Sequence, residues 1–410
     1  MSGPLSHIRV LDLSRVLAGP WAGQNLADLG AEVIKVERPK IGDDSRAFGP
    51  PWVKGRDGKD TKDSAYFTSA NRGKKSITVN LSVKAGQDLV RKLAAKCDVL
   101  LENYKYGDLA RYGLGYDDLK KINPRLVYCS VTGFGQSGPY RERPGYDFMI
   151  QGMGGMMSVT GEPDGAPGGG PQRAGVPIAD IITGMYASIA ICAALAHRDA
   201  QGPKGEGQHL DLALLDSQIA LLAYQNTNYF STGKPPGRIG NLHPNIVPYQ
   251  PFKSKDGEVI VACGNDNLFR KFCEAADCMD LANDPRFATN GKRVENRKVL
   301  TELIQKIFVK KTTAEWLPLL EAAGVPNGPI NDVAQVFEEP QVKARGVKLE
   351  LEHAAAGKIP LVASPMRFSG TPLEYRLAPP VLGQHTDEVL EKLLDLDAAA
   401  VARLRADGVI

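Results

Sequence analysis

Short runs of apolar, β-branched residues alternate with amphipathic stretches through the first third of this 410-residue chain. The apolar runs lie at 8–13, 32–36, 76–81, 98–101 and 126–131, with amphipathic stretches at 21–29 and 83–95. Strands that alternate with helices predict a parallel sheet that is covered by helices on both faces. Because the connections are short, we expect an α/β fold with a doubly wound, Rossmann-like sheet.

The composition changes near residue 231, where Ser, Thr, Gly and Pro gather in a turn-rich segment at 231–237. Before this break we expect a strand at 207–215 and a helix at 216–229. After it, a strand at 258–263 is followed by helices at 267–276, 298–309 and 316–323. We therefore predict a large Rossmann-like domain at 1–225, a smaller α/β domain at 226–335, and a segment at 336–410 that returns to the large domain.

Charge and cysteine usage exclude several classes of protein. The 50 basic and 47 acidic residues nearly cancel, so nothing favours binding to nucleic acid or to a membrane surface. The six cysteines form no CxxC pair and the six histidines have no metal-ligand spacing, so we expect no metal site. The start of the chain does not resemble a signal peptide, and the apolar run at 181–196 is short for a membrane span. We expect a cytoplasmic protein.

A single carboxylate, Asp180, stands at the mouth of that apolar run. The segment from 181 to 196 contains no residue that ionises near neutral pH, which predicts a buried helix with an acid in its first turn. An acid there can cap the helix by accepting hydrogen bonds from backbone N–H groups. It can also act as a nucleophile in a semi-dry pocket. Taken alone, the residue favours capping, because an aspartate at the start of a helix is common.

Polar residues follow three of the predicted strands. The turn at 14–20 joins the first strand to a helix that begins with Gly and Pro, which favours anion binding or a plain βα turn. Arg38 follows the second strand, and Asn103, Tyr104 and Arg111 follow another. Because these strand ends meet at one edge of a parallel sheet, we expect a phosphorylated ligand such as a coenzyme.

Two further features allow an ordinary interpretation. Residues 133–138 match GxGxxG, but Pro139 and three charged residues follow where a dinucleotide-binding fold would have a helix. We interpret this segment as a tight glycine loop that lines a pocket. His243 lies in a Gly- and Pro-rich loop, where it is either a simple loop residue or part of a site.

These signals occur in the order seen in the family III CoA-transferases, the group that includes formyl-CoA and carnitine CoA-transferases. The chain resembles that family along its whole length, most clearly at VLDLSRVLAGP (10–20), LGAEVIKVER (29–38), NRGKKS (71–76), ENY (102–104), TGFG (132–135) and GQHT (383–386). The resemblance implies an interlocked, ring-like homodimer. It also implies that CoA thioesters and small carboxylic acids are the substrates, with no tightly bound cofactor.

The family's nucleophilic aspartate falls on Asp180. The resemblance implies that this carboxylate attacks a donor thioester, passes through a mixed anhydride, and becomes an aspartyl-CoA thioester that a second acid then resolves. Backbone N–H groups at the start of the helix would stabilise the oxyanions. By similarity, the CoA-binding residues would be Val16, Ala18, Arg38, Val79, Asn103, Tyr104, Arg111 and Phe134.

The chain looks closest to the succinyl-CoA:glutarate, or dicarboxylate, CoA-transferases. A guanidinium suits the far carboxylate of a dicarboxylic acid, and we expect Arg72, assisted by Arg46, to bind it, although an ordinary surface arginine is the alternative. Tyr146 and His243 complete the predicted substrate-binding set. A glycine-rich loop like the one that covers the formyl-CoA transferase site has no clear counterpart at 230–250.

Two other functions fit the same fold. Related α-methylacyl-CoA racemases pair their aspartate with a histidine in a Gly-His-Asp stretch, where this chain has Gly145, Tyr146 and Asp147. An unperturbed tyrosine, with a pKa of about 10, does not readily replace an imidazole base. The second alternative is a non-catalytic CoA-binding protein, which could dispense with Asp180.

Overall fold

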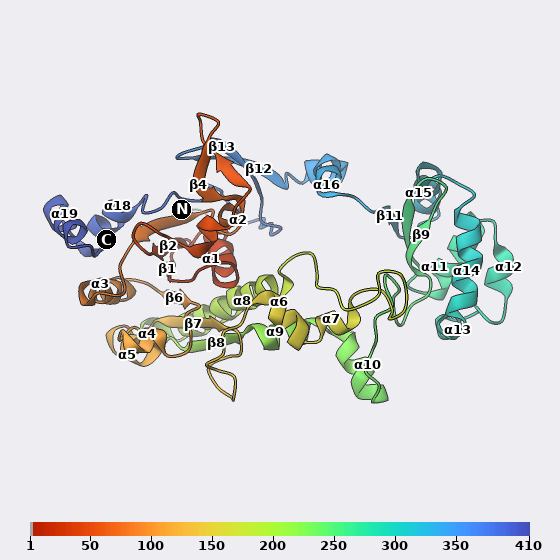
Figure 1. The fold of residues 1–410 in the computed structure, drawn as a ribbon, viewed down its shortest axis with the longest axis horizontal. Helices are drawn as coiled ribbons and strands as arrows, with labels where there is room; N and C mark the ends of the chain where they lie inside the picture. The colour runs from red at the N-terminus through yellow and green to blue at the C-terminus, as the bar shows by residue number, and fades with distance from the viewer. Residues whose placement is uncertain (1–2) are drawn as a thin grey trace. The chain divides into compact units, whose positions relative to one another are not determined.

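The computed structural model describes residues 3–410. The chain forms two compact units (Figure 1). The first contains the described residues up to 156 together with 174–232 and 343–410, and the second contains 157–173 and 233–342. The C-terminal part of the chain thus belongs to the first unit, and a short segment ahead of Asp180 belongs to the second. The domain boundaries expected near residues 225 and 335 remain a prediction.

A six-stranded parallel sheet forms the centre of the first unit and confirms the predicted parallel sheet. Its strand order is β5-β2-β1-β6-β7-β8, and every neighbouring pair is parallel. This is the order of a doubly wound Rossmann sheet. The strands are β1 (Arg9–Asp12), β2 (Glu32–Glu37), β5 (Lys74–Thr78), β6 (Val99–Glu102), β7 (Val127–Thr132) and β8 (His209–Ala213).

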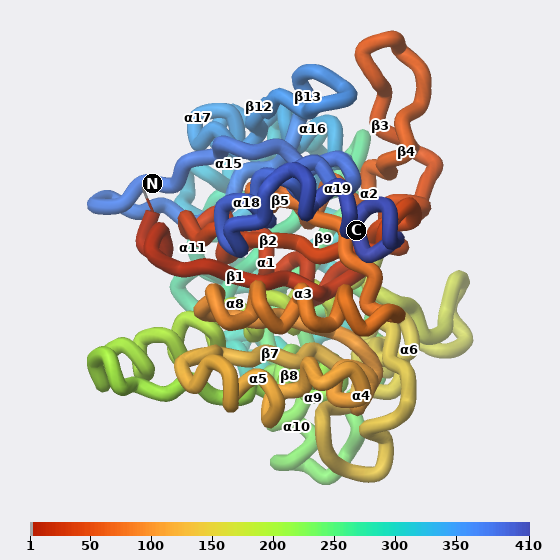
Figure 2. Tube along the Cα trace, turned by 90° about the vertical axis from the view of Figure 1, so that its left-hand side faces the viewer, coloured from red at the N-terminus to blue at the C-terminus, as the bar shows by residue number. Residues whose placement is uncertain are grey.

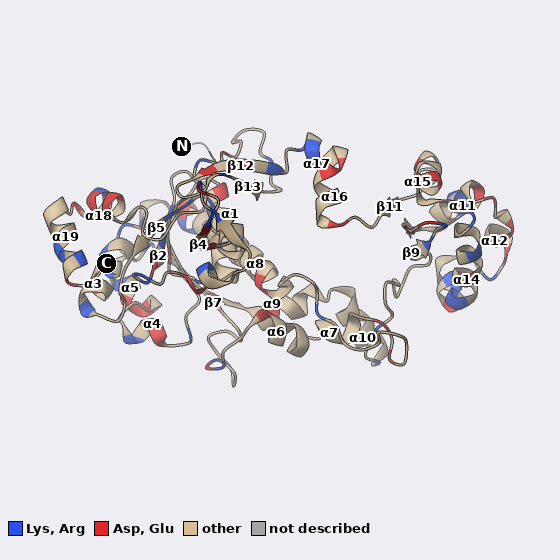
Figure 3. Ribbon diagram, turned by 45° about the horizontal axis from the view of Figure 1, so that its top comes forward, with Lys and Arg blue, Asp and Glu red and all other residues tan. Residues whose placement is uncertain are grey.

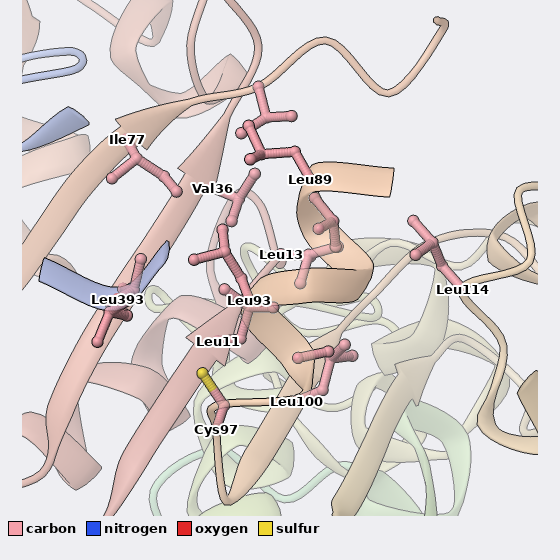
Figure 4. Packing of buried hydrophobic residues seen from close by; sticks show 14 of the residues in the cluster. Leu11, Leu13, Val36, Ile77, Leu89, Leu93, Cys97, Leu100, Leu114 and Leu393 are labelled. Carbon is pink, nitrogen blue, oxygen red and sulfur yellow. The ribbon is translucent and has the colours of Figure 1, made fainter. Parts of the chain in front are cut away.

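Helices cover both faces of this sheet because alternate strand residues bury apolar side chains on opposite sides. On one face, Leu11 and Leu100 pack with Leu89, Leu93 and Leu393 (Figure 4). The covering helices are α3 (Lys84–Ala94), α5 (Tyr116–Ile122), α18 (Thr386–Leu394) and α19 (Ala398–Ala406). Figure 2 shows α18, from the end of the chain, beside β5 from its first fifth.

The opposite face is covered by α1 (Ala18–Asp28) and α8 (Ile178–Ala200), which pack against each other. Within residues 3–410, α8 alone is long and apolar enough to cross a membrane. Helices in protein cores can have the same length and composition, and α8 packs along α1, α9 (Leu214–Leu221), β7 and β8.

The predicted single helix at 216–229 is wrong. Two helices replace it, α9 and α10 (Tyr224–Thr232), separated at Ala223. Ala223 has φ = 45°, a left-handed conformation that ends a right-handed helix. The apolar pattern continues across the break, so the pattern alone could not locate it.

The remaining elements of the first unit are short and lie mostly around the sheet. Charges of both signs occur together on α4 and α18 (Figure 3), which agrees with the nearly balanced composition. The elements are β3 (Trp52–Lys54), β4 (Asp60–Ser64), α2 (Ala65–Ser69), α4 (Asp108–Arg111), α6 (Asp147–Met153), β12 (Lys348–His353) and β13 (Gly357–Val362), with 3₁₀ turns at Asp44–Ala47 and Gly202–Lys204. Two more helices, α7 (Met156–Val159) and α17 (Pro340–Ala344), contain residues of both units.

The second unit has its own core around a three-stranded antiparallel sheet, ordered β11-β10-β9. Phe252, Phe272, Phe308 and Trp316 are fully buried there, and Phe308 stacks on Trp316 at 4.5 Å between ring centroids. The elements are β9 (Tyr249–Lys253), β10 (Glu258–Ala262), α11 (Asp266–Ala275), α12 (Met279–Asn283), α13 (Asn290–Glu295), α14 (Arg297–Phe308), α15 (Thr313–Ala322), β11 (Asn327–Pro329) and α16 (Val333–Glu338).

Candidate active site

A cavity of about 290 Å³ lies at the carboxyl ends of β1, β6 and β7, within the first unit. Its walls come from the turn after β1, the loop after β6, the end of β7, the loop at 141–146 and the first turn of α8. This is the edge at which parallel α/β sheets bind their ligands. Of the residues expected from the sequence, the cavity brings together Val16, Ala18, Asn103, Tyr104, Tyr146 and Asp180.

The turn after β1 is held in a strained conformation. Val16 has φ = 69°, which is unfavourable for a β-branched residue. Asp43 accepts a hydrogen bond from the Val16 N–H at 3.0 Å. The Asn103 side chain accepts from the Arg15 N–H at 2.8 Å and donates to the Arg15 carbonyl at 2.7 Å. The surrounding side chains therefore fix the backbone of this turn.

Two fully buried ion pairs lie beneath the turn. Lys35 contacts Asp43 at 2.8 Å and donates to the Ser14 carbonyl at 2.9 Å. Lys74 contacts Asp12 at 2.9 Å. Burial alone would raise the pKa of Asp43, but the Lys35 ammonium and backbone N–H groups hold it below its ordinary value. The sequence analysis missed these four residues; the available signal was a charge inside each of the apolar strands β1 and β2.

The Asp180 side chain lines the cavity. Asp180 is the third residue of α8, and within the part of the chain that the structure describes no hydrogen bond reaches its carboxylate. Burial, together with the nearby charge of Asp147, raises the pKa of Asp180 to about 7. A desolvated carboxylate without hydrogen bonds is a competent nucleophile once it has lost its proton.

Asp180 does not cap its own helix, because a second carboxylate does so. Asp147, on α6, accepts from the N–H of Ala179 at 2.8 Å and from the N–H of Asp180 at 3.4 Å. The N–H groups of Ile178 and Ile181 donate to the carbonyls of Val176 and Pro177. The expectation that backbone N–H groups at the start of this helix stabilise oxyanions is therefore wrong, because these groups already have partners.

Arg72 and Arg46 do not reach the cavity. The Arg72 guanidinium forms a buried pair with Asp28, in which its Nε donates at 2.9 Å. Arg46 donates to Glu37 at 2.7 and 2.8 Å and also pairs with Asp63. The expectation that these arginines bind a substrate carboxylate is corrected here, because buried acidic residues already occupy both guanidinium groups.

Five other expected residues do not line the cavity either. Arg38 is half-exposed and pairs with Asp44, whose carboxylate also contacts Arg15 at 3.0 Å. The Val79 side chain is buried in the hydrophobic core. Arg111 is largely exposed and pairs with Asp108. The Phe134 ring packs edge-on against Tyr140 at 5.5 Å between centroids. His243 belongs to the second unit, where burial lowers the pKa of its imidazole and Tyr249 lies 5.1 Å away.

Basic residues that the sequence analysis did not select line the cavity instead. They are Arg15, Lys105, Arg141 and Arg143. The Arg143 guanidinium lies over the rings of Tyr140 and Phe134, at 4.4 and 5.3 Å from their centroids, and has no ion-pair partner among residues 3–410. Such a cation can bind an anionic substrate group without first breaking an ion pair with a carboxylate of the protein. Within the same residues, His, Cys, Asp and Glu nowhere gather in a group able to hold a metal ion.

Gly184, one turn beyond Asp180, sets the spacing between α8 and α1. A Cβ atom at this position would lie 2.5 Å from the Ala18 carbonyl oxygen, which is a backbone atom and cannot easily move. We expect Gly184→Val to lower the free energy of unfolding by about 1–3 kcal/mol because the helices must separate. Urea unfolding measures this change. Ala193→Val, at an exposed position of the same helix, is the control, and equal stability of the two variants would refute the close-packing role.

Comparison with known proteins identifies the relatives of the chain. The model of CoA-transferase family III matches residues 5–386. The succinate–glutarate CoA-transferase of Agrobacterium fabrum is 49% identical over 397 residues, which cover 97% of each chain. The human succinyl-CoA:glutarate CoA-transferase is 44% identical over 407 residues, covering 99% of this chain and 90% of the human protein. The crystal structure of a CAIB/BAIF family protein from Brucella suis superposes with a TM-score of 0.82 at 48% identity, covering 96% of this chain and all of that one.

Proposed function

Because the chain belongs to CoA-transferase family III, we propose that it transfers coenzyme A reversibly from succinyl-CoA to glutarate or a similar dicarboxylate. One observation carries the proposal: Asp180, without hydrogen bonds to its carboxylate, lies in one cavity with the turn at 15–18 and four basic residues. The relatives named above act on these two substrates according to their names. No tightly bound cofactor takes part in the proposed reaction.

The reaction would proceed through covalent intermediates on Asp180. Its carboxylate attacks the thioester carbonyl of succinyl-CoA, forming a mixed anhydride and releasing the CoA thiolate. The thiolate attacks the aspartyl carbonyl of the anhydride, which gives an aspartyl-CoA thioester and free succinate. The acceptor carboxylate then repeats these steps in reverse, leaving as its CoA thioester and restoring Asp180. Dividing the exchange in this way replaces one difficult step by several easier ones.

CoA would bind along the carboxyl edge of the sheet. Val16, Ala18, Asn103 and Tyr104 line the cavity and would contact the part of CoA near the thioester. Arg38 would exchange its exposed partner Asp44 for a phosphate of CoA. The start of α1 would stabilise the oxyanions, because no side chain caps its first turn and Ala18 faces the same cavity as Asp180.

The second carboxylate of the substrate would bind to Arg143. This guanidinium lines the cavity and is oriented by two aromatic rings. Pro144, Gly145 and Tyr146, the next three residues of the chain, line the same cavity. We expect Arg143→Ala to lower kcat/KM for succinyl-CoA with glutarate by about 10- to 100-fold, the cost of one lost charged hydrogen-bonding pair. Exchange between acetyl-CoA and acetate, which lack the second carboxylate, should change far less. Equal losses for both substrate pairs would refute the assignment.

Racemase chemistry has less support from this site. It needs a second acid–base group opposite the aspartate, and the corresponding position holds Tyr146, which is 70% exposed. We expect no exchange of the α-proton of 2-methylacyl-CoA for deuterium.

We also propose a cytoplasmic, interlocked homodimer. The apolar side chains of Met185, Tyr186 and Ile189 on α8 and Phe230 on α10 are exposed in the single chain, as expected of surfaces that a second copy covers. Sedimentation of the purified protein tests the dimer.

Acyl exchange followed by liquid chromatography tests the proposed function. Succinyl-CoA is incubated separately with glutarate, formate, oxalate, itaconate and acetate. We expect glutaryl-CoA to form fastest, with release of one succinate for each glutaryl-CoA. CoA binding without exchange to any acid would favour the non-catalytic alternative, and preferred transfer to formate or acetate would refute the dicarboxylate assignment.

A further inference from the structure

The backbone at the start of α8 depends on a carboxylate from another helix. Pro177 precedes the first residue of α8 and provides no side-chain acceptor. Asp147 fills this position from α6, although it lies 33 residues before Asp180 in the chain. Figure 1 shows α6 beside the start of α8, and the two helices are in contact. Asp147 thus performs the helix-capping role that the sequence suggested for Asp180.

Asp147 is itself held in place by a second residue. The Gln151 amide donates to the free oxygen of Asp147 at 2.7 Å. The amide oxygen of Gln151 accepts from the N–H of Ala174 at 2.8 Å, in the segment that leads into α8. Gln151 is fully buried, and it links Asp147 to the chain just ahead of α8. Side chains fixed in this way can hold a reacting group to a fraction of an ångström.

We propose that Asp147 is a positioning residue for the nucleophile: by binding the backbone of Ala179 and Asp180 it fixes the start of α8 and leaves the Asp180 carboxylate free. This inference rests on the proposed function for its effect on the reaction. Its effect on ionisation does not depend on the reaction.

The charges around Asp180 affect how easily its carboxylate ionises. Asp147 is a like charge beside it, and burial and this charge both raise the pKa of Asp180. Burial, together with the charges of Asp180 and Asp147, raises the pKa of Tyr66 on α2 to about 12, so its phenol stays neutral. Other acids near α8 have different surroundings: Asp28 of α1 pairs with Arg72, Asp211 of β8 accepts from the Gln136 backbone, and Asp216 of α9 is exposed. The cations that line the cavity are Arg15, Lys105, Arg141 and Arg143.

Two substitutions separate position from charge. Asp147→Asn keeps an oxygen that accepts from the Ala179 N–H but removes the charge and the acceptor for the Gln151 amide, so the acid limb of kcat/KM should move to lower pH from its wild-type position near 7. Asp147→Ala removes the acceptor as well. It should lower kcat by a further 10- to 100-fold, roughly the cost of a misplaced nucleophile. Asp397→Asn, which removes a carboxylate that caps α19 through the Ala400 N–H, is the matched control and should leave the limb unchanged.

A readout without turnover keeps this test independent of the proposed reaction. The free energy of unfolding is measured across pH for four proteins: the wild type, Asp180→Asn, Asp147→Asn and the double variant. In each background, the difference between the proteins with and without Asp180 changes at a pH that reports the pKa of Asp180. We expect a lower pH in the Asp147→Asn background. If the pH at which the stability difference changes, the acid limb and the rate were all the same in Asp147→Asn as in the wild type, the proposal would be overturned. If that pH shifted but the wild type showed no acyl exchange, this proposal would stand and the proposed function would be refuted.

Discussion

Replacing Asp180 by Asn should lower the rate of acyl exchange by a factor on the order of 10⁴ or more, because the substitution removes the nucleophile of the proposed covalent mechanism. The carboxamide has nearly the same size, and the N–H groups that hold the start of α8 donate to Asp147, so the helix should remain in place. Succinyl-CoA binding, measured by calorimetry, should change little. Asp180→Ala serves as a second variant that cannot revert to Asp by hydrolysis.

Asp180→Asn should also be more stable than the wild type in mildly alkaline solution. The pKa of Asp180 rises from 3.8 to about 7 on folding, so its ionised form is less favourable in the folded protein than in the unfolded chain. Above pH 7, Asp180 therefore lowers the free energy of unfolding, and this cost disappears as the pH falls towards 3.8. Asp180→Asn should unfold at higher urea concentration near neutral and alkaline pH, with little difference in acid. A destabilised variant would show instead that Asp180 has a structural role.

Asp43→Ala should give the largest loss of stability, about 3–5 kcal/mol, because it leaves the Lys35 ammonium buried without its partner. It also removes the acceptor for the Val16 N–H, so the strained turn after β1 should relax. If this turn binds CoA as proposed, CoA affinity should fall. Because the folded-state pKa of Asp43 is lowered, its stabilising effect is present above its unfolded pKa of 3.8 and is lost as the pH falls through the folded value.

Two design choices make this measurement specific. Trp316 reports on the second unit, so unfolding is followed by fluorescence in a Trp316→Phe background, where Trp21 and Trp52 of the first unit remain. Asp60→Ala is the matched control, because Asp60 pairs with Lys54 on the surface and should contribute no more than about 1 kcal/mol. If Asp43→Ala lost no more stability than Asp60→Ala, the buried pair would not support the turn.

Features that depend on local pattern could be predicted from the sequence. The apolar strands identified the parallel sheet, because burial on both faces leaves a continuous apolar run. The uncharged run after Asp180 located α8, although the expected full burial of this helix is wrong: Met185, Tyr186 and Ile189 are exposed in the single chain. The residues after β1 and β6 were expected at one sheet edge, and Val16, Ala18, Asn103 and Tyr104 share a cavity there.

Features that depend on partners distant in the chain could not be predicted. Arg72 was expected to face a ligand, but Asp28, 44 residues away, binds it in the interior. The capping role considered for Asp180 belongs to Asp147, 33 residues earlier, and no local signal marks that pairing. The resemblance supplied the family and the nucleophile, whereas hydrogen bonding around the nucleophile required the structure.

Mass spectrometry of the enzyme after brief incubation with succinyl-CoA tests the role of Asp180 most directly. The reaction is quenched in acid without an acceptor, and the protein is digested. The peptide that contains Asp180 should gain the mass of one CoA less one water, and hydroxylamine should remove the adduct. Rapid exchange with no adduct on this peptide, together with an active Asp180→Ala variant, would show that the acyl group is transferred without this carboxylate.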